Sequence, residues 1–413
     1  MLKRFPAMKP PVSGREVAAI SALVTYDTLS PAAIGMTAPR SIKRPQEVIS
    51  SAEGAWDEVT AQAGNVKPAQ QPEEPTRHWP DFDAQRFAPT TGNEARIEAN
   101  IQAISLLKTL QQEGREPTDD ERHQLLRYIG WGGLARIFEE IPNNTLGAQQ
   151  QRLKALLTED EFNSARASTT SAFYTDPVVV TAIWHIIQRL GFKGGRICEP
   201  SAGTGMFLAG MPKEIAVKSE ITAVELDKIT SDILGAIFGG LGVQTFSSAI
   251  EKAPVPHGFY DLGVGNVPFG DHKTLETKKV GYANWLIHNY FFGKAVDMVR
   301  PGGLIVLITS TGTLDSATDA HRKWLSAHAE MLGAIRLPAN AFKKQAGTEV
   351  VTDVLVFKKR EAPVFNDRPE WIGQAQAPES MLMPGQSKSY YSNAARRYVD
   401  PLSGTLRVGV IPT

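Results

Sequence analysis

Residues 199–205 combine an acidic side chain with two glycines where a predicted strand turns into a predicted helix. Glycines let a backbone approach a ligand closely, and a helix N-terminus offers unpaired N–H groups. The dinucleotide-binding pattern is absent because Leu208 occupies its third glycine position, and the phosphate-loop sequence is also missing. Glu199 would repel a pyrophosphate and attract a cationic amino or sulfonium group. The turn therefore predicts a site for a nucleoside that carries a positive centre.

A second acid and an amide follow later strands of the same predicted sheet. Glu225 ends the next strand about 20 residues further on, where an acid reaches ribose hydroxyls in this architecture. A carboxylate that caps the following helix is the alternative. Asn266 ends the largely apolar run 260–265. Because the carboxyl ends of parallel strands meet at one edge, we expect these side chains to surround one ligand.

Residues 266–269 have the groups to activate an amine. The exocyclic amine of a base is a poor nucleophile because its lone pair is delocalised into the ring. Two acceptors would make the nitrogen more tetrahedral: the Asn266 amide oxygen and the Val267 carbonyl, which Pro268 holds in an extended conformation. Phe269 offers a face for a base taken out of its stack. A plain turn with a buried Phe269 is the alternative, and the acids upstream favour the amine site.

Strand and helix patterns alternate from residue 196 onward. The predicted strands are 196–199, 221–225, 243–246, 261–265, 304–309, 332–336 and 352–357. This alternation predicts an α/β fold with a doubly wound, mostly parallel, seven-stranded sheet covered by helices on both faces. Upstream, apolar residues at helical spacing over 97–110 and capping-box signatures at Thr118 and Thr158 predict an N-terminal helical region.

These patterns divide the chain into four parts. Residues 1–92 form a proline-rich arm that we expect to be largely disordered, and 93–167 form the helical region. Residues 168–360 form the catalytic α/β domain, and 361–413 an irregular tail or the stub of a further module. Within the helical region, glycines flank Trp131 at 130–134. We expect a helix-ending turn there, packed by the tryptophan, with a ligand or DNA contact as the alternative.

The composition excludes several classes of protein. Lys+Arg and Asp+Glu balance at 44 each, so any nucleic-acid contact must rest on local basic patches. The single cysteine, Cys198, rules out an internal disulfide and a cysteine-based zinc cluster, and the eight histidines form no ligand-spaced cluster. No apolar run approaches the roughly 20 residues of a membrane span, and the first residues lack a signal-peptide core. We expect a cytoplasmic protein with no metal and no membrane partner.

Beyond these patterns, the chain resembles S-adenosylmethionine-dependent adenine-N6 DNA methyltransferases whose cofactor turn precedes the catalytic loop. Within that family it is most similar to the methylase region of large phage- and plasmid-borne helicase-methylase proteins. The matching segments are 130–134, 172–175, 199–205, 265–270, 288–292, 300–303 and 333–338, together with Glu225 and Phe342. The resemblance covers residues 94–359, which leaves the arm and the tail outside it.

The resemblance implies direct transfer of a methyl group from S-adenosylmethionine to the N6 amine of adenine. Tyr174 and Thr175 would line the methionine end of the cofactor, and Glu225 would bind its ribose. The implied cofactor site also includes Glu199, Pro200, Ala202, Gly203, Gly205 and Asn266. The implied catalytic loop, which holds the flipped adenine, consists of Asn266, Val267, Pro268 and Phe269.

Two positions depart from the pattern of the family. Val267 replaces the first of two usual prolines, and we expect activity to survive because the carbonyl does the accepting and Pro268 is retained. Ser247 and Ser248 stand where a carboxylate often binds the adenine amine of the cofactor. A hydroxyl or a backbone carbonyl would have to replace that carboxylate.

DNA is the expected partner, through basic side chains near the catalytic loop. The first candidate group is His272, Lys273, Lys278 and Lys279, and the second is Arg336, Lys343 and Lys344. A solvated loop is the alternative for the first group. No segment has the size of an independent base-reading domain, so we expect sequence specificity to be either minimal or supplied by a partner such as a helicase or specificity subunit. Two other functions stay open: a non-catalytic accessory subunit that binds cofactor or DNA, and methylation of RNA or of a protein glutamine.

Overall fold

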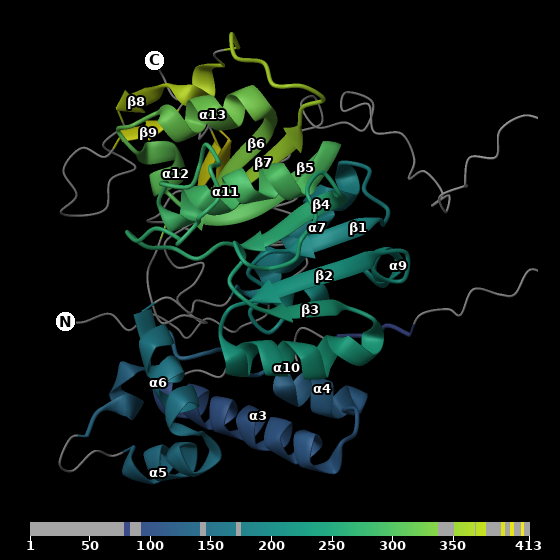
Figure 1. Ribbon diagram of the computed structural model, residues 1–413, viewed down its shortest axis with the longest axis vertical. Coiled ribbons are helices and arrows are strands. Elements are labelled where there is room, and N and C mark those ends of the chain that lie inside the picture. The colour runs from purple at the N-terminus through teal and green to yellow at the C-terminus, as the bar shows by residue number, and fades with distance from the viewer. Residues whose placement is uncertain are drawn as a thin grey trace, which may run out of the picture.

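The computed structural model describes residues 78–82, 92–140, 146–170, 175–337, 351–367, 369–376, 390–392, 397–399 and 406–408. A nine-stranded sheet with the order β11-β10-β6-β7-β5-β4-β1-β2-β3 runs through the molecule (Figure 1). Its strands are β1 Arg196–Glu199, β2 Glu220–Glu225, β3 Gln244–Ser247, β4 Tyr260–Asn266, β5 Val299–Ser310, β6 Ala329–Leu337, β7 Thr352–Lys359, β10 Arg397–Val399 and β11 Leu406–Val408. Two further short strands, β8 Gln374–Gln376 and β9 Tyr390–Ser392, pair with each other.

The first seven strands confirm the predicted fold class. Strands β1 to β5 pair in parallel, and β7 lies antiparallel between β5 and β6. The sheet is therefore mostly parallel, as the alternating pattern predicted. Strands β10 and β11, from the predicted tail, extend the sheet beyond β6, with β10 parallel to β6. Weak strand signals at 406–410 were the only sequence hint of this extension.

Helices cover both faces because the central strands are apolar on both sides. Alternate residues of β5 enter opposite cores: Val306 packs in the core with α7, α8 and α10, and Leu307 packs in the core with α11 and α13. The longer of these helices are α7 Pro177–Arg189, α10 Lys228–Phe238, α11 Ile287–Met298 and α13 Ala320–His328. The shorter turns are η1 Ala135–Phe138, η2 Ser168–Thr170, α8 Met206–Ala209, α9 Lys213–Ala216, η3 Gly239–Leu241, α12 Gly312–Asp315 and η5 Glu370–Ile372.

The N-terminal helices lie on the outer side of α10 and contact it through α3 and α4 (Figure 1). They are α3 Asn93–Glu113, α4 Asp119–Leu125, α5 Gly147–Leu156 and α6 Glu159–Ala167. Both predicted capping boxes are present, at Thr118 and Thr158. Arg122 of α4 is buried, and its guanidinium donates to the carbonyls of Ala236 and Ile237 near the end of α10. This contact satisfies terminal carbonyls that the helix itself leaves without partners.

Part of the predicted arm is described, at residues 78–82. Trp79 and Phe82 are buried there, and their ring centroids lie 5.8 and 5.4 Å from that of Phe238 on α10. The remainder of 1–91 lies outside the described residues. Across the segments that the structure describes, no helix combines the length and apolar character needed to cross a membrane.

Asn100 of α3 fixes the turn at 129–133. Its buried side-chain amide donates to the Gly130 carbonyl at 2.6 Å and accepts from the Ile129 N–H at 2.9 Å. Trp131 is buried beside them, as the sequence predicted for a packed turn. The Asn100 side chain thus supplies hydrogen bonds to two buried backbone groups that would otherwise have no partner.

Replacing Asn100 by leucine should lower the free energy of unfolding by about 2–6 kcal/mol, because two buried backbone groups lose their partners at about 1–3 kcal/mol each. Urea unfolding measures the change. Gln102→Leu, on the exposed side of the same helix, is the matched control and should stay within about 0.5 kcal/mol. Equal effects of the two substitutions would contradict the structural role of Asn100.

Candidate active site

Three neighbouring parallel strands deliver the predicted polar side chains to one edge of the sheet. Glu199 ends β1, Glu225 ends β2 and Asn266 ends β4, and the sheet order places β1 between the other two strands. The direction of strand progression reverses between β1 and β4. Open α/β sheets bind ligands at such a reversal, outside the carboxyl ends of the strands.

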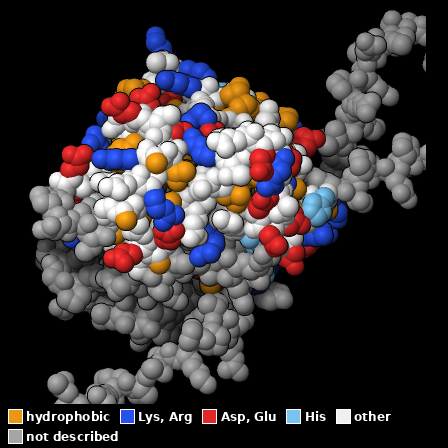
Figure 2. Space-filling model, turned by 90° about the horizontal axis from the view of Figure 1, so that it is seen from below, with side chains coloured by type: hydrophobic (Ala, Val, Ile, Leu, Met, Phe, Trp, Pro, Cys, Tyr) orange, Lys and Arg blue, Asp and Glu red, His pale blue; other side chains and the backbone are white. Residues whose placement is uncertain are grey.

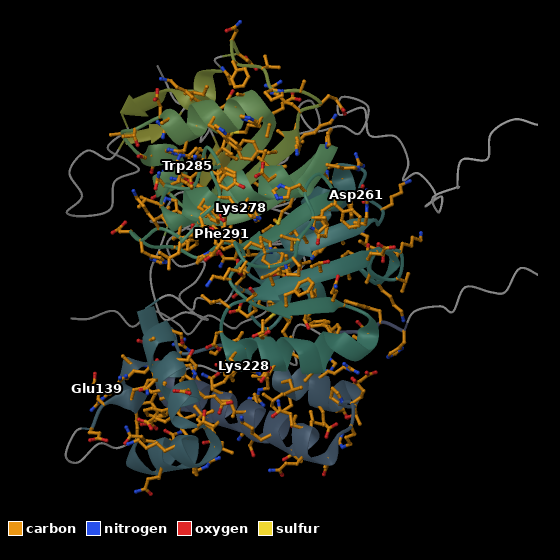
Figure 3. The ribbon with its side chains drawn as sticks, viewed as in Figure 1. Glu139, Lys228, Asp261, Lys278, Trp285 and Phe291 are labelled. Atoms are coloured by element: carbon orange, nitrogen blue, oxygen red, sulfur yellow. The ribbon has the colours of Figure 1, made fainter. Side chains whose placement is uncertain are left out.

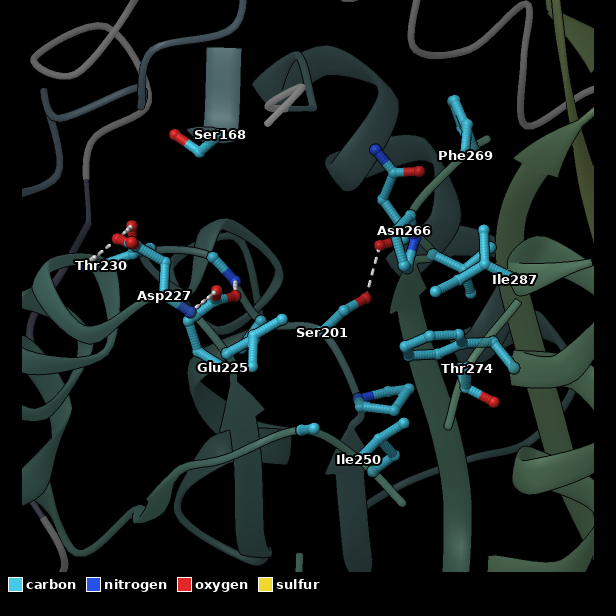
Figure 4. Close-up of a pocket in the computed structure, with 18 of the residues that line it drawn as sticks. Ser168, Ser201, Glu225, Asp227, Thr230, Ile250, Asn266, Phe269, Thr274 and Ile287 are labelled. Carbon is cyan, nitrogen blue, oxygen red and sulfur yellow. Dashed lines mark hydrogen bonds between the residues drawn. The ribbon is translucent and has the colours of Figure 1, made fainter. Parts of the chain in front are cut away.

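Hydrogen bonds tie the turn at 200–205 to both neighbouring strands. The N–H of Gly203 donates to Glu225 Oε2 at 2.9 Å, and the N–H of Ala202 donates to the Val224 carbonyl at 2.9 Å. On the other side, Ser201 Oγ donates to the Asn266 carbonyl at 2.7 Å (Figure 4). The positive φ of 55° at Gly203 belongs to the region that favours glycine. The turn at 200–205 and the loop that begins at Asn266 are therefore joined directly through Ser201.

A cavity of about 640 Å³ opens along this edge. Twelve of the predicted site residues line it: Thr175, Glu199, Pro200, Ala202, Gly203, Glu225, Asn266, Val267, Pro268, Phe269, His272 and Lys273. In Figure 4, Glu225 and Asp227 lie on one side of Ser201, and Asn266 and Phe269 on the other. This arrangement leaves space for a nucleoside cofactor and for an acceptor base. Tyr174, Lys343 and Lys344 lie outside the described residues.

Gly205 lies outside the lining of the cavity. Close packing against α10, and not contact with the cavity, explains why a glycine stands there. Its φ is 84°, and a Cβ there would lie 2.4 Å from a ring carbon of Phe238 and 2.9 Å from Leu234. The glycine lets the turn pack closely against α10. The predicted helix that follows the turn is α8, which is four residues long.

Glu199 is buried at the base of the cavity, with 1% of its surface exposed. Gly265 of β4 makes room for it, since a Cβ at 265 would lie 3.3 Å from Glu199 Cγ. Burial raises the pKa of Glu199 well above its usual range, and the nearby charge of Glu225 raises it further. Among the described residues, Glu199 Oε2 has no hydrogen-bond partner. A buried carboxyl oxygen that faces a cavity fits a cationic ligand group, as the sequence predicted.

Glu225 is also held by backbone groups. Its two carboxylate oxygens accept from the N–H groups of Gly203 and Asp227, at 2.9 and 2.8 Å. Burial raises the pKa of Glu225 to about 7, and these hydrogen bonds oppose the rise. An ionised carboxylate has about four acceptor sites, so each oxygen keeps room for a hydroxyl donor. The helix-capping alternative does not fit, because Asp227 caps α10 through the N–H of Thr230.

Val267 has a structural role that a proline could not fill. Its N–H donates to the Ile308 carbonyl of β5 at 3.1 Å, and its side chain is 2% exposed within the core under α11. The β4–β5 ladder therefore continues one residue past Asn266. This bond and Pro268 together fix the orientation of the Val267 carbonyl. The departure from the two-proline pattern thus adds a hydrogen bond to the sheet.

Sequence reasoning missed the wall that the helical region contributes to the cavity. Gly130, Ser164 and Ser168 line it, although they lie far upstream of the sheet. Glu251 also lines it, and supplies a carboxylate shortly after the predicted serine position, where Ser248 lines the cavity too. The glycines around Trp131 were a signal for Gly130. Nothing local marked the others, because their approach depends on how the helices dock.

The predicted basic groups divide into two kinds. His272, Lys273, Lys278 and Lys279 are exposed on the loop that follows the catalytic residues. Arg336 differs from its expected role, because its half-buried side chain lies between Asp315 and Asp353, at 2.9 and 2.8 Å. The strand register places Asp353 opposite Arg336. Over the described part of the face in Figure 2, positive and negative side chains are interspersed. The exposed basic side chains of 272–279 remain a candidate nucleic-acid contact.

Where the structure describes the chain, no group of three or more His, Cys, Asp or Glu side chains is placed to hold a metal ion. The site presents carboxylates, an amide and backbone carbonyls around the cavity. Together, the sheet and these groups resemble those of S-adenosylmethionine-dependent methyltransferases.

Two relatives show sequence similarity to this chain. It is 28% identical over 307 residues to Defense against restriction protein B of Escherichia phage P1, a match that covers 74% of this chain and 12% of that protein. It is 25% identical over 194 residues to the rRNA N(6)-adenosine-methyltransferase metl-5 of Caenorhabditis elegans, covering 45% of this chain and 86% of that protein. The chain thus spans about an eighth of the phage protein. No protein-family model matches it.

Solved structures with a similar fold include a type I restriction-modification system methyltransferase subunit from Streptococcus thermophilus. The identity is 17%, the match covers 67% of this chain and 68% of that one, and the TM-score is 0.39.

The buried acids predict a pH-dependent affinity for a cationic ligand. The pKa of Glu225 is raised to about 7 and that of Glu199 is also raised, so a rise in pH that removes their protons strengthens the attraction of a bound sulfonium or ammonium group. The dissociation constant of S-adenosylmethionine should therefore fall with rising pH, and binding should release protons. Titration calorimetry in buffers of different ionisation enthalpy measures both quantities.

Glu199→Gln is the matched variant, because glutamine mimics the neutral carboxyl and preserves the packing. It should flatten the pH dependence and release fewer protons on binding. A variant that binds the cofactor with the unchanged pH profile would show that Glu199 does not face the positive charge.

Proposed function

We propose that this chain transfers a methyl group from S-adenosylmethionine to the N6 amine of adenine in DNA. The observation that carries the proposal is the junction at Ser201, which binds the catalytic loop to the cofactor turn at 2.7 Å. A base held at Asn266 and a cofactor held at Glu199 and Glu225 would share one cavity. Holding both reactants in that geometry removes much of the entropic barrier.

The chain's own groups would activate the amine. The Asn266 amide oxygen and the Val267 carbonyl accept the two N6 hydrogens, so the nitrogen lone pair is withdrawn from the ring. Phe269 packs against both cores and offers a stacking face for the base. S-adenosylmethionine, when bound, supplies an electrophilic methyl group. The N6 nitrogen would form a bond to that carbon as the carbon–sulfur bond breaks, its electron pair returning to sulfur and the neutral thioether leaving, and water would take the proton that N6 then loses.

The cofactor residues would act by position and charge. Glu225 accepts from ribose hydroxyls, and Glu199 faces the cationic end of the cofactor. Thr175, which is buried in the wall, would lie with Tyr174 near the methionine end. Glu251 would take the place of the missing carboxylate near the adenine of the cofactor.

DNA is favoured as substrate by the restriction-related relative and by the lysines next to the catalytic loop. An RNA adenine is the second candidate, favoured by the similarity to metl-5, most of whose length is covered. A helicase or specificity subunit would supply sequence recognition, and assembly with such partners in a restriction-modification setting is part of the proposal.

Asn266→Ala should lower methyl transfer to duplex DNA by on the order of a hundredfold or more, because it removes one of two acceptors aimed at the reacting amine. Labelled S-adenosylmethionine measures incorporation, and calorimetry on the same protein measures cofactor binding. Asn366→Ala, at an exposed position after β7, is the matched control and should leave incorporation unchanged.

Unchanged incorporation in Asn266→Ala would overturn the assigned mechanism. Cofactor binding by the unsubstituted protein, without transfer to DNA, RNA or a glutamine-containing peptide, would identify a non-catalytic accessory subunit instead.

A further inference from the structure

Leu275 stands out on the loop between β4 and α11. Its side chain is 81% exposed, yet it lines the rim of the same cavity as Asn266 and Phe269. A single exposed leucine is common on protein surfaces and needs no explanation by itself. This leucine, however, lies within a basic segment, since Lys273, Lys278 and Lys279 are all exposed around it. An apolar side chain framed by positive charges at the mouth of a site suits a nucleic acid.

The loop that carries Leu275 is anchored at several points. Lys273 forms an antiparallel bridge with Leu286, and the N–H of Ile287 donates to the His272 carbonyl at 2.9 Å. Next to Leu275, Glu276 accepts from the hydroxyl of Tyr290 at 2.8 Å, and from the N–H of Lys278 at 2.8 Å.

Tyr290 is fully buried on α11, so it holds the loop against a rigid helix. Figure 3 shows Lys278 near Phe291 of that helix, toward the carboxyl ends of the strands and away from Asp261. The exposure of Leu275 is therefore imposed by bonded neighbours on a fixed loop.

We propose that Leu275 is a positioning residue that enters the base stack of duplex DNA beside the extruded adenine; this rests on the proposed function. Taking a base out of the stack costs a few kcal/mol and leaves a gap in the duplex. Apolar side chains such as leucine fill gaps of this kind in other DNA-binding proteins. The flanking lysines would contact the phosphates on either side of the gap.

Leu226 is the other exposed leucine that lines the cavity, and its position helps to distinguish the proposed role of Leu275 from cofactor binding. Leu226 is 71% exposed and directly follows Glu225, so it belongs to the cofactor side. Leu275 instead follows the catalytic loop by six residues, on the side of the acceptor base.

Leu275→Ala should lower kcat/KM on duplex DNA by about tenfold, equivalent to roughly 1.4 kcal/mol. Transfer to the same sequence as a single strand should be unchanged, because little stacking opposes base extrusion there. The KM for S-adenosylmethionine should also be unchanged. A duplex with 2-aminopurine at the target position should show a smaller fluorescence increase on binding, and Leu275→Met should restore both readouts.

Phe365→Ala is the matched control, because this side chain is 75% exposed after β7 and lies outside the cavity lining. It should leave all of these values unchanged. Full duplex activity of Leu275→Ala would overturn the proposed role of Leu275. An equal loss of activity on duplex and single-stranded DNA, with a raised KM for S-adenosylmethionine, would also overturn it. An unsubstituted protein that methylates neither form of DNA would overturn the proposed function itself, and with it the proposed role of Leu275.

Discussion

The parallel pairing of β4, β1 and β2 is the constraint on which the site depends. Each strand ends in a polar side chain, and the register places Glu199, Glu225 and Asn266 at one edge. Two hydrogen bonds then convert this edge into a site: Gly203 to Glu225, and Ser201 to Asn266. A change in the register of either strand would separate the turn at 200–205 from the loop that begins at Asn266, because the hydrogen bonds that join them lie next to the strand ends.

Electrostatics around the turn follow from the same packing. Burial raises the pKa of both Glu199 and Glu225, and the charge of Glu225 raises the pKa of Glu199 further. A cationic cofactor would lower the cost of ionising these carboxyls, whereas a nucleotide pyrophosphate would increase it. The pair therefore selects by charge, and the backbone N–H groups of Gly203 and Asp227 orient Glu225 before any ligand arrives.

Much of this fold could be predicted from the sequence because its signals are local. Apolar runs located the strands, and Thr118 and Thr158 marked helix starts through capping boxes that the structure confirms. Contacts between distant segments could not be predicted. The wall formed by Gly130 and Ser164 requires the helical region to dock on α10.

Arg336 illustrates the same limit. Its positive charge made it a candidate phosphate contact, yet the β6–β7 register gives it Asp353 as a partner. Val267 shows the converse, since a departure from a family pattern is explained by one ladder hydrogen bond to Ile308. Neither pairing is visible without the register.

The most direct measurement is mass spectrometry of nucleosides from cells that express this chain or its Asn266→Ala variant. The account predicts N6-methyladenine in the DNA of the first culture and its loss in the second. Methylation confined to RNA or to protein glutamine, or N6-methyladenine at equal levels in both cultures, would contradict it.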